Sequence, residues 1–213
     1  MIKAVVLISG DGSNLQAIID QITLNKWPVS IKLVVSNVAD AFGLERAKRA
    51  TINTACVDNR AFSTRLAFDL ALIDQIDRTE PDLVILAGFM RILTPEFVSH
   101  YHDHLINIHP SLLPEHPGTN THQRAIDAQD QWHGTSVHFV VAEVDAGPII
   151  LQGRCVIQAN ESAEQLQARV LKIEHHLYPL AVKWFAERRL TIEDGQVLLD
   201  GKKSEQQMQT FNG

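Results

Sequence analysis

The first half of the chain alternates short apolar runs with amphipathic segments, and this rhythm restricts the fold more than any other feature. Residues 2–8 form a continuous β-branched run, which is typical of a strand buried on both faces. Strands that alternate with helices build a parallel sheet through right-handed crossovers. The sequence therefore predicts an α/β fold with a doubly wound, mostly parallel central sheet. Further strands are predicted at 31–36, 54–57, 82–88 and 104–109, and helices at 14–22, 43–50, 65–77 and 95–101.

After residue 130 the pattern changes. Residues 134–141 alternate apolar and polar side chains, and residues 148–157 follow a Val-Asp-Ala-Gly turn. These runs predict antiparallel additions to the sheet in the C-terminal third. Residues 162–187 have the spacing of one long amphipathic helix, with Ser162 as its N-cap and Pro179 where it can kink.

At 213 residues the chain is most simply one domain with a small appendage. A short strand pair is expected around Asp194-Gly195, and the polar residues after it are expected to be disordered. We therefore expect a single domain over residues 1–190 and a tail over residues 191–213.

Charge and cysteine usage argue against several classes of protein. The formal net charge is -6 and no long Lys/Arg run occurs, which makes nucleic acid an unlikely partner. No segment approaches the roughly 20 apolar residues of a membrane span, and the first apolar run is too short for a signal peptide. Cys56 and Cys155 fit no zinc spacing and no secreted disulfide framework. We expect two free thiols in a cytoplasmic protein.

Ligands of such sheets bind outside the carboxyl ends of the strands, so the strand ends are the candidate sites. Residues 9–15 read Ser-Gly-Asp-Gly-Ser-Asn-Leu between the first strand and the first helix. Gly10 and Gly12 permit tight backbone geometry, and the helix N-terminus offers free N–H groups that suit a phosphate. Ser13 and Asn14 add side-chain donors. The alternative is an ordinary strand-to-helix turn.

This turn is not a nicotinamide-binding fingerprint, because Leu15 stands where the third glycine would be. It also lacks the Gly-Lys-Ser/Thr of a P-loop. Residues 87–93 follow another buried strand, and they could form the wall of a binding cleft. On these residues alone, a core-packing turn with Arg91 at the surface is the preferred interpretation.

Asn107 and His109 end the fifth predicted strand, and their side chains share one face of it. An amide and an imidazole can polarise a carbonyl and stabilise the oxyanion formed when a nucleophile attacks. Pro110 and Pro114 would stiffen the loop that follows. Asp145, in the Val-Asp-Ala-Gly turn, would raise the pKa of His109 if the two met. The alternatives are a satisfied histidine at a strand end and a turn aspartate bonded to its own backbone.

A metal site is not expected. Histidines are dense in this region, but neither an HExxH motif nor a compact His/Cys pattern occurs. A Gly-x-Ser-x-Gly elbow of a serine hydrolase is also missing. The histidines concerned are His100, His102, His104, His109, His116 and His122.

Several stretches, taken together, resemble the phosphoribosylglycinamide formyltransferases, which are folate-dependent enzymes of purine synthesis with a Rossmann-like fold. The likeness runs in order from about residue 2 to about residue 190. The stretches that carry it are VVLISGDGSNLQAIID, SNVADAFGLERA, LAGFMRIL, INIHPSLLP, HGTSVHFV and DAGPIILQ.

The resemblance implies transfer of a formyl group from 10-formyltetrahydrofolate to the amine of 5'-phosphoribosylglycinamide, without a metal. It also implies a monomer or weak homodimer without nucleic-acid or membrane partners. The implied catalytic residues are Asn107, His109 and Asp145. The implied substrate-binding residues are Gly12, Ser13, Asn14, Lys172, Ile173 and Glu174. The folate pocket would be lined by Arg65, Met90, Arg91, Ile92, Leu93, Asn107, Val141, Ala142, Glu143, Val144 and Asp145.

One departure from the family concerns Thr119-Asn120, where its bacterial members tend to have Leu-His. Asn120 is therefore not assigned to the site, whereas His122 stays a candidate neighbour. Methionyl-tRNA formyltransferase and formyltetrahydrofolate hydrolase share the chemistry, but each carries a further domain for which this chain has no room. A non-catalytic module that binds a nucleotide is an alternative of another class, and a nicotinamide-dependent dehydrogenase is a third.

Overall fold

The computed structural model describes residues 1–203 and 208–211. The chain divides into two compact units, each of which is described by itself. The first unit comprises residues 1–107 with 140–142, and the second comprises residues 108–139 with 143–213. The expected division into a domain over 1–190 and a tail over 191–213 stays a prediction.

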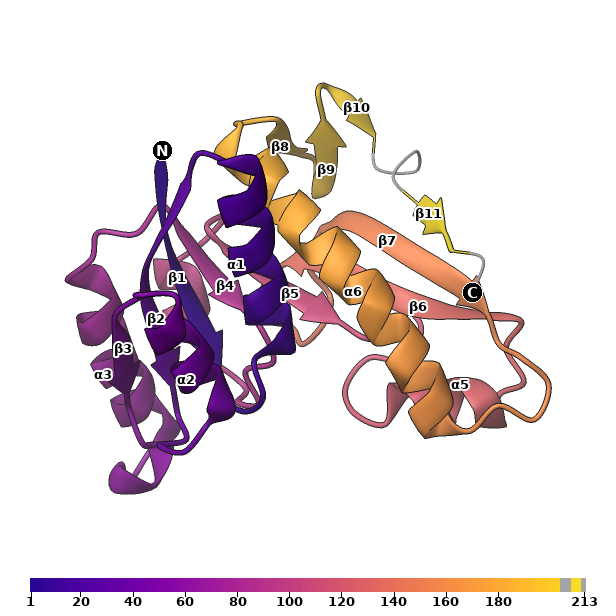
Figure 1. Ribbon diagram of the computed structural model, residues 1–213, viewed down its shortest axis with the longest axis horizontal. Helices are drawn as coiled ribbons and strands as arrows, with labels where there is room; N and C mark the ends of the chain where they lie inside the picture. Colours follow the sequence, from indigo (N-terminus) through magenta and orange to yellow (C-terminus); the bar gives the residue numbers. More distant parts are fainter. Residues whose placement is uncertain (204–207, 212–213) are drawn as a thin grey trace. The chain divides into compact units, whose positions relative to one another are not determined.

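The first unit is a parallel sheet with helices between its strands (Figure 1). Its strand order is β5-β4-β1-β2-β3, and every neighbouring pair is parallel. The strands are β1 (Ile2–Ile8), β2 (Val29–Ser36), β3 (Thr54–Cys56), β4 (Leu83–Leu86) and β5 (Leu105–His109), of which β5 continues into the second unit. The helices are α1 (Ser13–Asn25), α2 (Phe42–Arg49), the 3-10 turn η1 (Asn59–Ala61), α3 (Arg65–Asp77) and α4 (Pro95–His100).

Helices cover both faces of this sheet. Alternate residues of β1, including Val5 and Leu7, pack in one buried cluster with Phe68 of α3 and Phe97 of α4. Ile8 points to the opposite face, where it contacts α2, and α1 packs against α2. Because side chains alternate along a strand, a strand that feeds both faces must be apolar throughout. The predicted doubly wound, mostly parallel sheet is confirmed.

The strand order reverses direction at β1. The chain moves outward from β1 to β2 and β3, then returns to place β4 on the other side of β1. The segments that leave the carboxyl ends of β1 and β4 therefore run to opposite sides of the sheet. This is a topological switch point, where open α/β sheets bind their ligands. Residues 9–14 leave β1 at this point, and residues 88–93 follow β4. We name them the glycine loop and the Met90 loop.

The second unit is built on an antiparallel pair, β6 (Trp132–Phe139) and β7 (Ile149–Val156), as predicted. The long helix α6 (Ala163–Ala186) packs on both strands. Gly153 of β7 permits close packing, because a Cβ there would lie 2.5 Å from Cγ2 of Ile173. A small sheet of order β10-β9-β8 follows, formed by β8 (Leu190–Glu193), β9 (Gln196–Leu199) and β10 (Lys202–Lys203).

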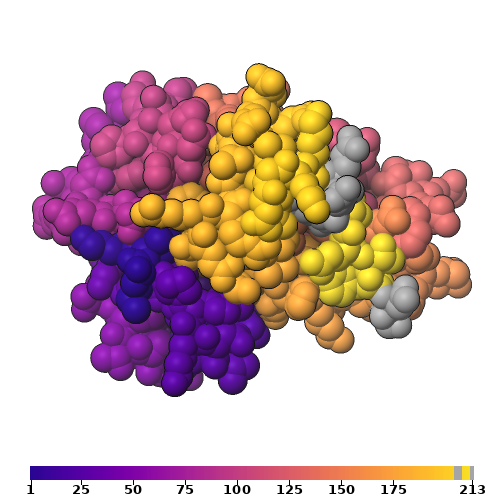
Figure 2. All heavy atoms as spheres, turned by 90° about the horizontal axis from the view of Figure 1, so that it is seen from above, coloured from indigo at the N-terminus to yellow at the C-terminus, as the bar shows by residue number. Residues whose placement is uncertain are grey.

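The C-terminal segment differs from the expectation. Residues 208–210, expected in a disordered tail, form β11 (Met208–Thr210), which pairs in parallel with β7. Phe211 fixes this strand, because its N–H donates to the carbonyl of Arg154 at 2.9 Å and its ring contacts that of His176. Figure 2 shows this segment in yellow at the surface. The rest of the tail expectation, at 204–207 and 212–213, lies outside the described residues.

Two further elements complete the comparison with the sequence. Helix α5 (Thr121–Asp127) and the turn η1 were not predicted. Pro179 lies inside α6, which continues through it as one element.

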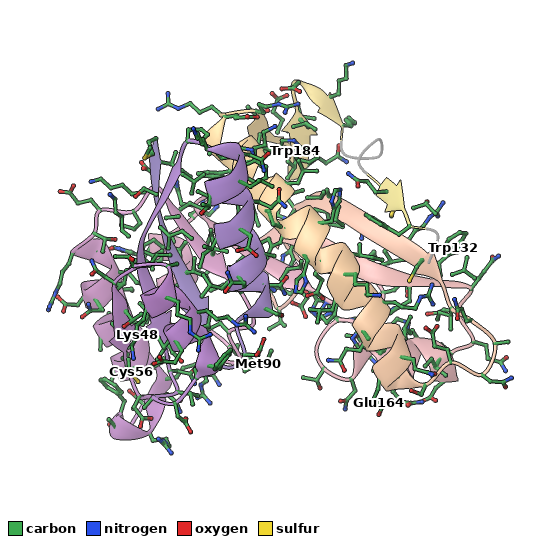
Figure 3. All side chains as sticks on the ribbon, in the orientation of Figure 1. Lys48, Cys56, Met90, Trp132, Glu164 and Trp184 are labelled. Atoms are coloured by element: carbon green, nitrogen blue, oxygen red, sulfur yellow. The ribbon has the colours of Figure 1, made fainter. Side chains whose placement is uncertain are left out.

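Cys56 is an exposed free thiol at the end of β3 (Figure 3), and Cys155 is a buried free thiol. Within the described parts of the chain, no helix has the length and apolar character that crossing a membrane requires.

Helix α6 should depend on its N-terminal capping box. Ser162 accepts from the N–H of Gln165 at 3.3 Å, and the Gln165 side chain accepts from the N–H of Ser162 at 2.9 Å. Ser162→Ala should lower the unfolding free energy by about 1 kcal/mol, seen as a Tm lower by about 2–4 °C in thermal denaturation. Ser162→Thr keeps the hydroxyl and should stay near the wild-type Tm. Equal losses in both variants would contradict a role of the cap.

Candidate active site

The glycine loop is held in a conformation that requires its glycines. Gly12 is the N-cap of α1 and adopts a left-handed backbone with φ of 75°. A Cβ at this position would lie 2.7 Å from the Cα of Gly43, so the two backbones touch. Ser13 begins the helix, and Asn14 is buried. As the N-cap, Gly12 makes no side-chain hydrogen bond to the first turn of α1, and a helix N-terminus of this kind can bind an anion through its N–H groups.

A carboxylate within the glycine loop is neutralised by α2. Arg46 donates from Nη2 to both carboxylate oxygens of Asp11, at 3.1 and 3.0 Å, and from Nε to the Asp11 carbonyl at 2.8 Å. The N–H of Gly43 also donates to the carbonyl of Gly10 at 3.0 Å. Without Arg46, the negative charge of Asp11 would oppose an anion in the loop. The loop is therefore fixed to α2 and its charge is balanced.

The Met90 loop presents apolar side chains to solvent. Met90, labelled in Figure 3, is 75% exposed and Ile92 is 59% exposed, while Arg91 is also at the surface. Leu93 packs instead against the buried cluster of the unit. Exposed apolar side chains that gather in one loop are typical of a ligand-binding surface. Met90 and Ile92 therefore do not pack in the core, whereas Leu93 does, and a role of this loop in ligand binding stays a prediction.

The end of the Met90 loop is anchored by a buried carboxylate. Asp69 of α3 is 1% exposed and accepts from the N–H of Thr94 at 2.6 Å. Burial raises the pKa of Asp69, although its hydrogen bonds to Thr94 and the nearby charges of Arg65 and Arg91 oppose the rise. Arg65, the first residue of α3, is exposed. Three of the predicted pocket residues, Arg65, Arg91 and Leu93, therefore gather around one end of α3.

His109 and Asp145 meet in the second unit. Nδ1 of His109 lies 3.4 Å from Oδ2 of Asp145, and both side chains are more than nine-tenths buried. Nε2 of His109 lies 3.0 Å from the carbonyl of His116, to which it can only donate. Both ring nitrogens therefore face oxygen acceptors. Asn107 lies two residues earlier on β5, so its side chain leaves the strand on the side of His109.

Asp145 is fixed by contacts that the sequence did not reveal. It has a left-handed backbone with φ of 56°, and its Oδ2 accepts from the N–H of Gly118 at 2.8 Å. Its Oδ1 lies 3.9 Å from Nε2 of His138. His138 donates from Nδ1 to the carbonyl of Phe139, and burial lowers its pKa. The interpretation of Asp145 as an inward-pointing carboxylate is therefore favoured over a turn residue bonded to itself.

Residues 110–120, which we name the proline loop, are held by side chains from β6 and β7. Ser136 donates to the carbonyl of Ser111 at 2.7 Å and accepts from the N–H of Leu113 at 3.0 Å. Gln152 donates to the carbonyl of Leu113 at 2.9 Å. Thr135 donates to the carbonyl of His109 at 2.8 Å. Polar side chains of the neighbouring strands thus add to any stiffness that the prolines supply.

The dense histidines pair separately. Nε2 of His116 lies 2.6 Å from Oδ2 of Asp130, and Nε2 of His133 lies 3.0 Å from Nδ1 of His122. Within the described ranges, no group of three or more His, Cys, Asp or Glu residues could hold a metal ion. His122 therefore pairs with His133, and it also lies close enough to His109 for the charge of that ring to lower its pKa, after the larger effect of burial. Asn120 begins α5 as its left-handed N-cap, and its side chain makes no capping hydrogen bond there.

The remaining predicted residues lie on α6 and in the segment after β6. Lys172 is exposed, whereas Ile173 and Glu174 are buried. Val141 and Ala142 belong to the first unit, and Glu143 and Val144 belong to the second. Val144 is 50% exposed. The functional roles of these residues stay predictions.

Comparisons with known proteins agree on one family. The model of the formyl transferase family matches residues 2–182. Phosphoribosylglycinamide formyltransferase of Escherichia coli K12 is 53% identical over 199 residues, covering 93% of this chain and 94% of that protein. The trifunctional purine biosynthetic protein adenosine-3 of Homo sapiens is 39% identical over 196 residues, covering 92% of this chain and 19% of that protein.

Solved structures show the same similarity over the whole fold. Phosphoribosylglycinamide formyltransferase of Coxiella burnetii superposes with a TM-score of 0.92 at 46% identity and covers 99% of both chains. Glycinamide ribonucleotide transformylase 1 of Symbiobacterium toebii has a TM-score of 0.91 at 43% identity, covering 93% of this chain and 94% of that chain.

The buried His133 should make the protein sensitive to acid. Burial lowers the pKa of His133 from its ordinary 6.5 to about 4, so the unfolded chain binds more protons than the folded protein between these pH values. Stability should be fully present above about pH 6.5 and fall toward about pH 4, by up to about 3 kcal/mol from this residue. Urea unfolding at several pH values measures the fall.

The comparison of two histidine variants isolates this effect. His133→Gln cannot titrate, so its unfolding free energy should depend less steeply on pH over the same interval, whatever its absolute stability. His102→Gln is the control, because the His102 side chain is 71% exposed, and it should keep the wild-type dependence. An unchanged pH dependence in His133→Gln would contradict the assignment to this residue.

Proposed function

The chain belongs to the phosphoribosylglycinamide formyltransferases, which are formyl-transferring enzymes, and from this premise we propose its reaction and the residues that carry it. We propose that it moves the formyl group from 10-formyltetrahydrofolate to the glycinamide amine of 5'-phosphoribosylglycinamide in purine biosynthesis. The observation that carries the proposal is the buried pair of His109 and Asp145 at the carboxyl end of β5. A hydrogen-bond donor at this place suits attack on a carbonyl.

The reaction needs one bond to form and one to break. The amine nitrogen of the acceptor attacks the formyl carbon, and the carbonyl electrons move onto the formyl oxygen. Collapse of this adduct restores the carbonyl and breaks the bond to N10 of the folate. The amine loses one proton and N10 gains one. The enzyme must therefore stabilise an oxyanion and help to move a proton.

We assign the oxyanion to Asn107 and His109. The Nε2–H group of His109 is bonded to a peptide carbonyl, an acceptor that an incoming formyl oxygen can replace. Asn107 would supply a second donor from its amide. Asp145 faces the other ring nitrogen and is fixed by Gly118, so it would orient the imidazole. His109 would then pass a proton toward N10. No metal and no covalent enzyme intermediate enters this scheme.

We assign binding of the acceptor to two sets of residues. Gly12, Ser13 and Asn14 would hold the phosphate, supported by the glycine N-cap of α1, which makes no side-chain cap, and by the neutralised charge of Asp11. On α6, Lys172, Ile173 and Glu174 would complete the acceptor site. Buried Glu174 would orient the amine.

We assign the folate to the exposed apolar surface of the Met90 loop and its neighbours. Met90 and Ile92 would contact the flat pterin ring. Arg65 and Arg91 carry positive charge that suits the acidic tail of a folate. The full set is Arg65, Met90, Arg91, Ile92, Leu93, Asn107, Val141, Ala142, Glu143, Val144 and Asp145. We further propose a cytoplasmic enzyme that acts as a monomer or weak homodimer, without nucleic-acid or membrane partners.

Formyl transfer by the purified protein tests the function. The assay supplies 5'-phosphoribosylglycinamide and 10-formyltetrahydrofolate with a chelator present, and follows the appearance of tetrahydrofolate. We expect turnover that requires both compounds and is insensitive to the chelator. Release of formate without the acceptor would identify a hydrolase instead. Folate binding without turnover would mean that the acceptor is wrong.

Replacement of His109 tests the mechanism. His109→Ala should lower kcat by about a hundredfold to ten-thousandfold, because the donor to the oxyanion and to N10 is lost. His109→Asn keeps an amide donor for the His116 carbonyl but cannot transfer a proton, and it should also be impaired. Steady-state kinetics and circular dichroism measure activity and folding. His102→Ala, at an exposed site, is the control. A folded His109→Asn enzyme with near-normal kcat would refute the proposed proton transfer.

A further inference from the structure

A chain of hydrogen bonds crosses the topological switch point of the first unit. The N–H of Met90 donates to Oγ of Ser9 at 2.7 Å, and Oγ of Ser9 donates to Oδ1 of Asn37 at 2.6 Å. Nδ2 of Asn37 then donates to Oδ1 of Asn59 at 2.9 Å. These three hydrogen bonds thus join the glycine loop, the Met90 loop, the end of β2 and the turn η1. None of the roles assigned above uses these side chains.

The N–H of Met90 fixes the donor and acceptor roles in all three hydrogen bonds. A peptide N–H can only donate, so Ser9 must accept from Met90. The single hydroxyl hydrogen of Ser9 is then directed to an acceptor, which orients the amide of Asn37. Asn37 is 6% exposed, so its remaining donor needs the acceptor that Asn59 supplies. Removing one member therefore breaks the hydrogen bonds that orient its neighbours.

A backbone contact also joins the two loops at their starts. The N–H of Ser9 donates to the carbonyl of Gly88 at 3.1 Å. Beyond that contact, the glycine loop is fixed to α2 through Arg46, and the Met90 loop is fixed at its far end through Asp69 and Thr94. The Ser9 hydroxyl is thus a side-chain link between the two loops, which follow the adjacent strands β1 and β4.

We propose that Ser9 is a positioning residue that sets the Met90 loop against the glycine loop, and so sets the formyl donor against the acceptor. This inference rests on the function proposed above, which places the folate on the first loop and the phosphate on the second. Transfer between two bound molecules requires their reacting atoms in near-attack geometry, and a misplacement of about 1 Å can cost about a hundredfold in rate. The Asn37–Asn59 pair holds Ser9 in the required orientation.

Ser9→Ala removes the link with little change in side-chain volume. We expect kcat to fall by about tenfold or more, and the KM for 10-formyltetrahydrofolate to rise by about fivefold. The KM for 5'-phosphoribosylglycinamide should rise less, because Arg46 and Gly43 still hold the glycine loop. In hydrogen exchange, the Met90 amide should exchange at least about tenfold faster than in the wild type.

Variants of Asn59 provide the matched control. Asn59 contributes only an acceptor, so Asn59→Asp should keep the kinetic constants within about twofold of the wild type. Asn59→Ala removes the acceptor and should shift kcat and KM in the same direction as Ser9→Ala, by a smaller factor. Thermal denaturation of each variant separates a loss of stability from a loss of positioning.

Three results would overturn the inference. The first is a folded Ser9→Ala enzyme with kcat and both KM values within about twofold of the wild type. The second is an unchanged exchange rate of the Met90 amide in that variant. The third is an Asn59→Asp enzyme as impaired as Ser9→Ala. A wild-type protein without formyl transfer would instead refute the proposed function, so the two failures are told apart by the wild-type assay.

Discussion

The pairing of β1 with β2 on one edge and β4 on the other is the interaction on which the first unit depends. Val5, Val6 and Leu7 have no exposed surface, so the strand needs cover on both faces as well as partners on both edges. The apolar area that this strand buries strongly favours one arrangement of the neighbouring elements. Both edges and both faces of β1 are covered by other elements. The glycine loop begins at the carboxyl end of this strand.

Much of this fold could be predicted because its elements follow their own apolar periodicity. The bounds of β1 and α3 agree with the predicted ranges 2–8 and 65–77. Helix α5 escaped prediction because Thr121–Asp127 spans only two turns and begins with Thr and His, which are weak helix formers. β11 escaped because Met-Gln-Thr is too short to show an alternating strand pattern of its own, and it pairs where β7 offers backbone groups.

The candidate site was predictable as a set of residue types at strand ends, but its contacts were not. Asp145 meets His109 across 36 positions of sequence, a contact that depends on how β6 and the turn after it fold back. The proline loop is held by Ser136 and Gln152, which no local pattern connects to it. From the sequence, Ser9 was only the first residue of the glycine loop. Its partners, Asn37 and Met90, follow the strands β2 and β4, so only the tertiary structure reveals them.

The short strand β11 has a consequence for the behaviour of the protein at high concentration. β11 and Phe211 cover the outer edge of β7 at residues 152–154, and α6 packs against the same strand. An uncovered edge strand exposes N–H and C=O groups that can template pairing with another chain. A chain shortened before residue 208, or one whose C-terminal fusion pulls β11 away, would present that edge to its neighbours. Such a protein would aggregate through β7 even though every residue of the candidate site was intact.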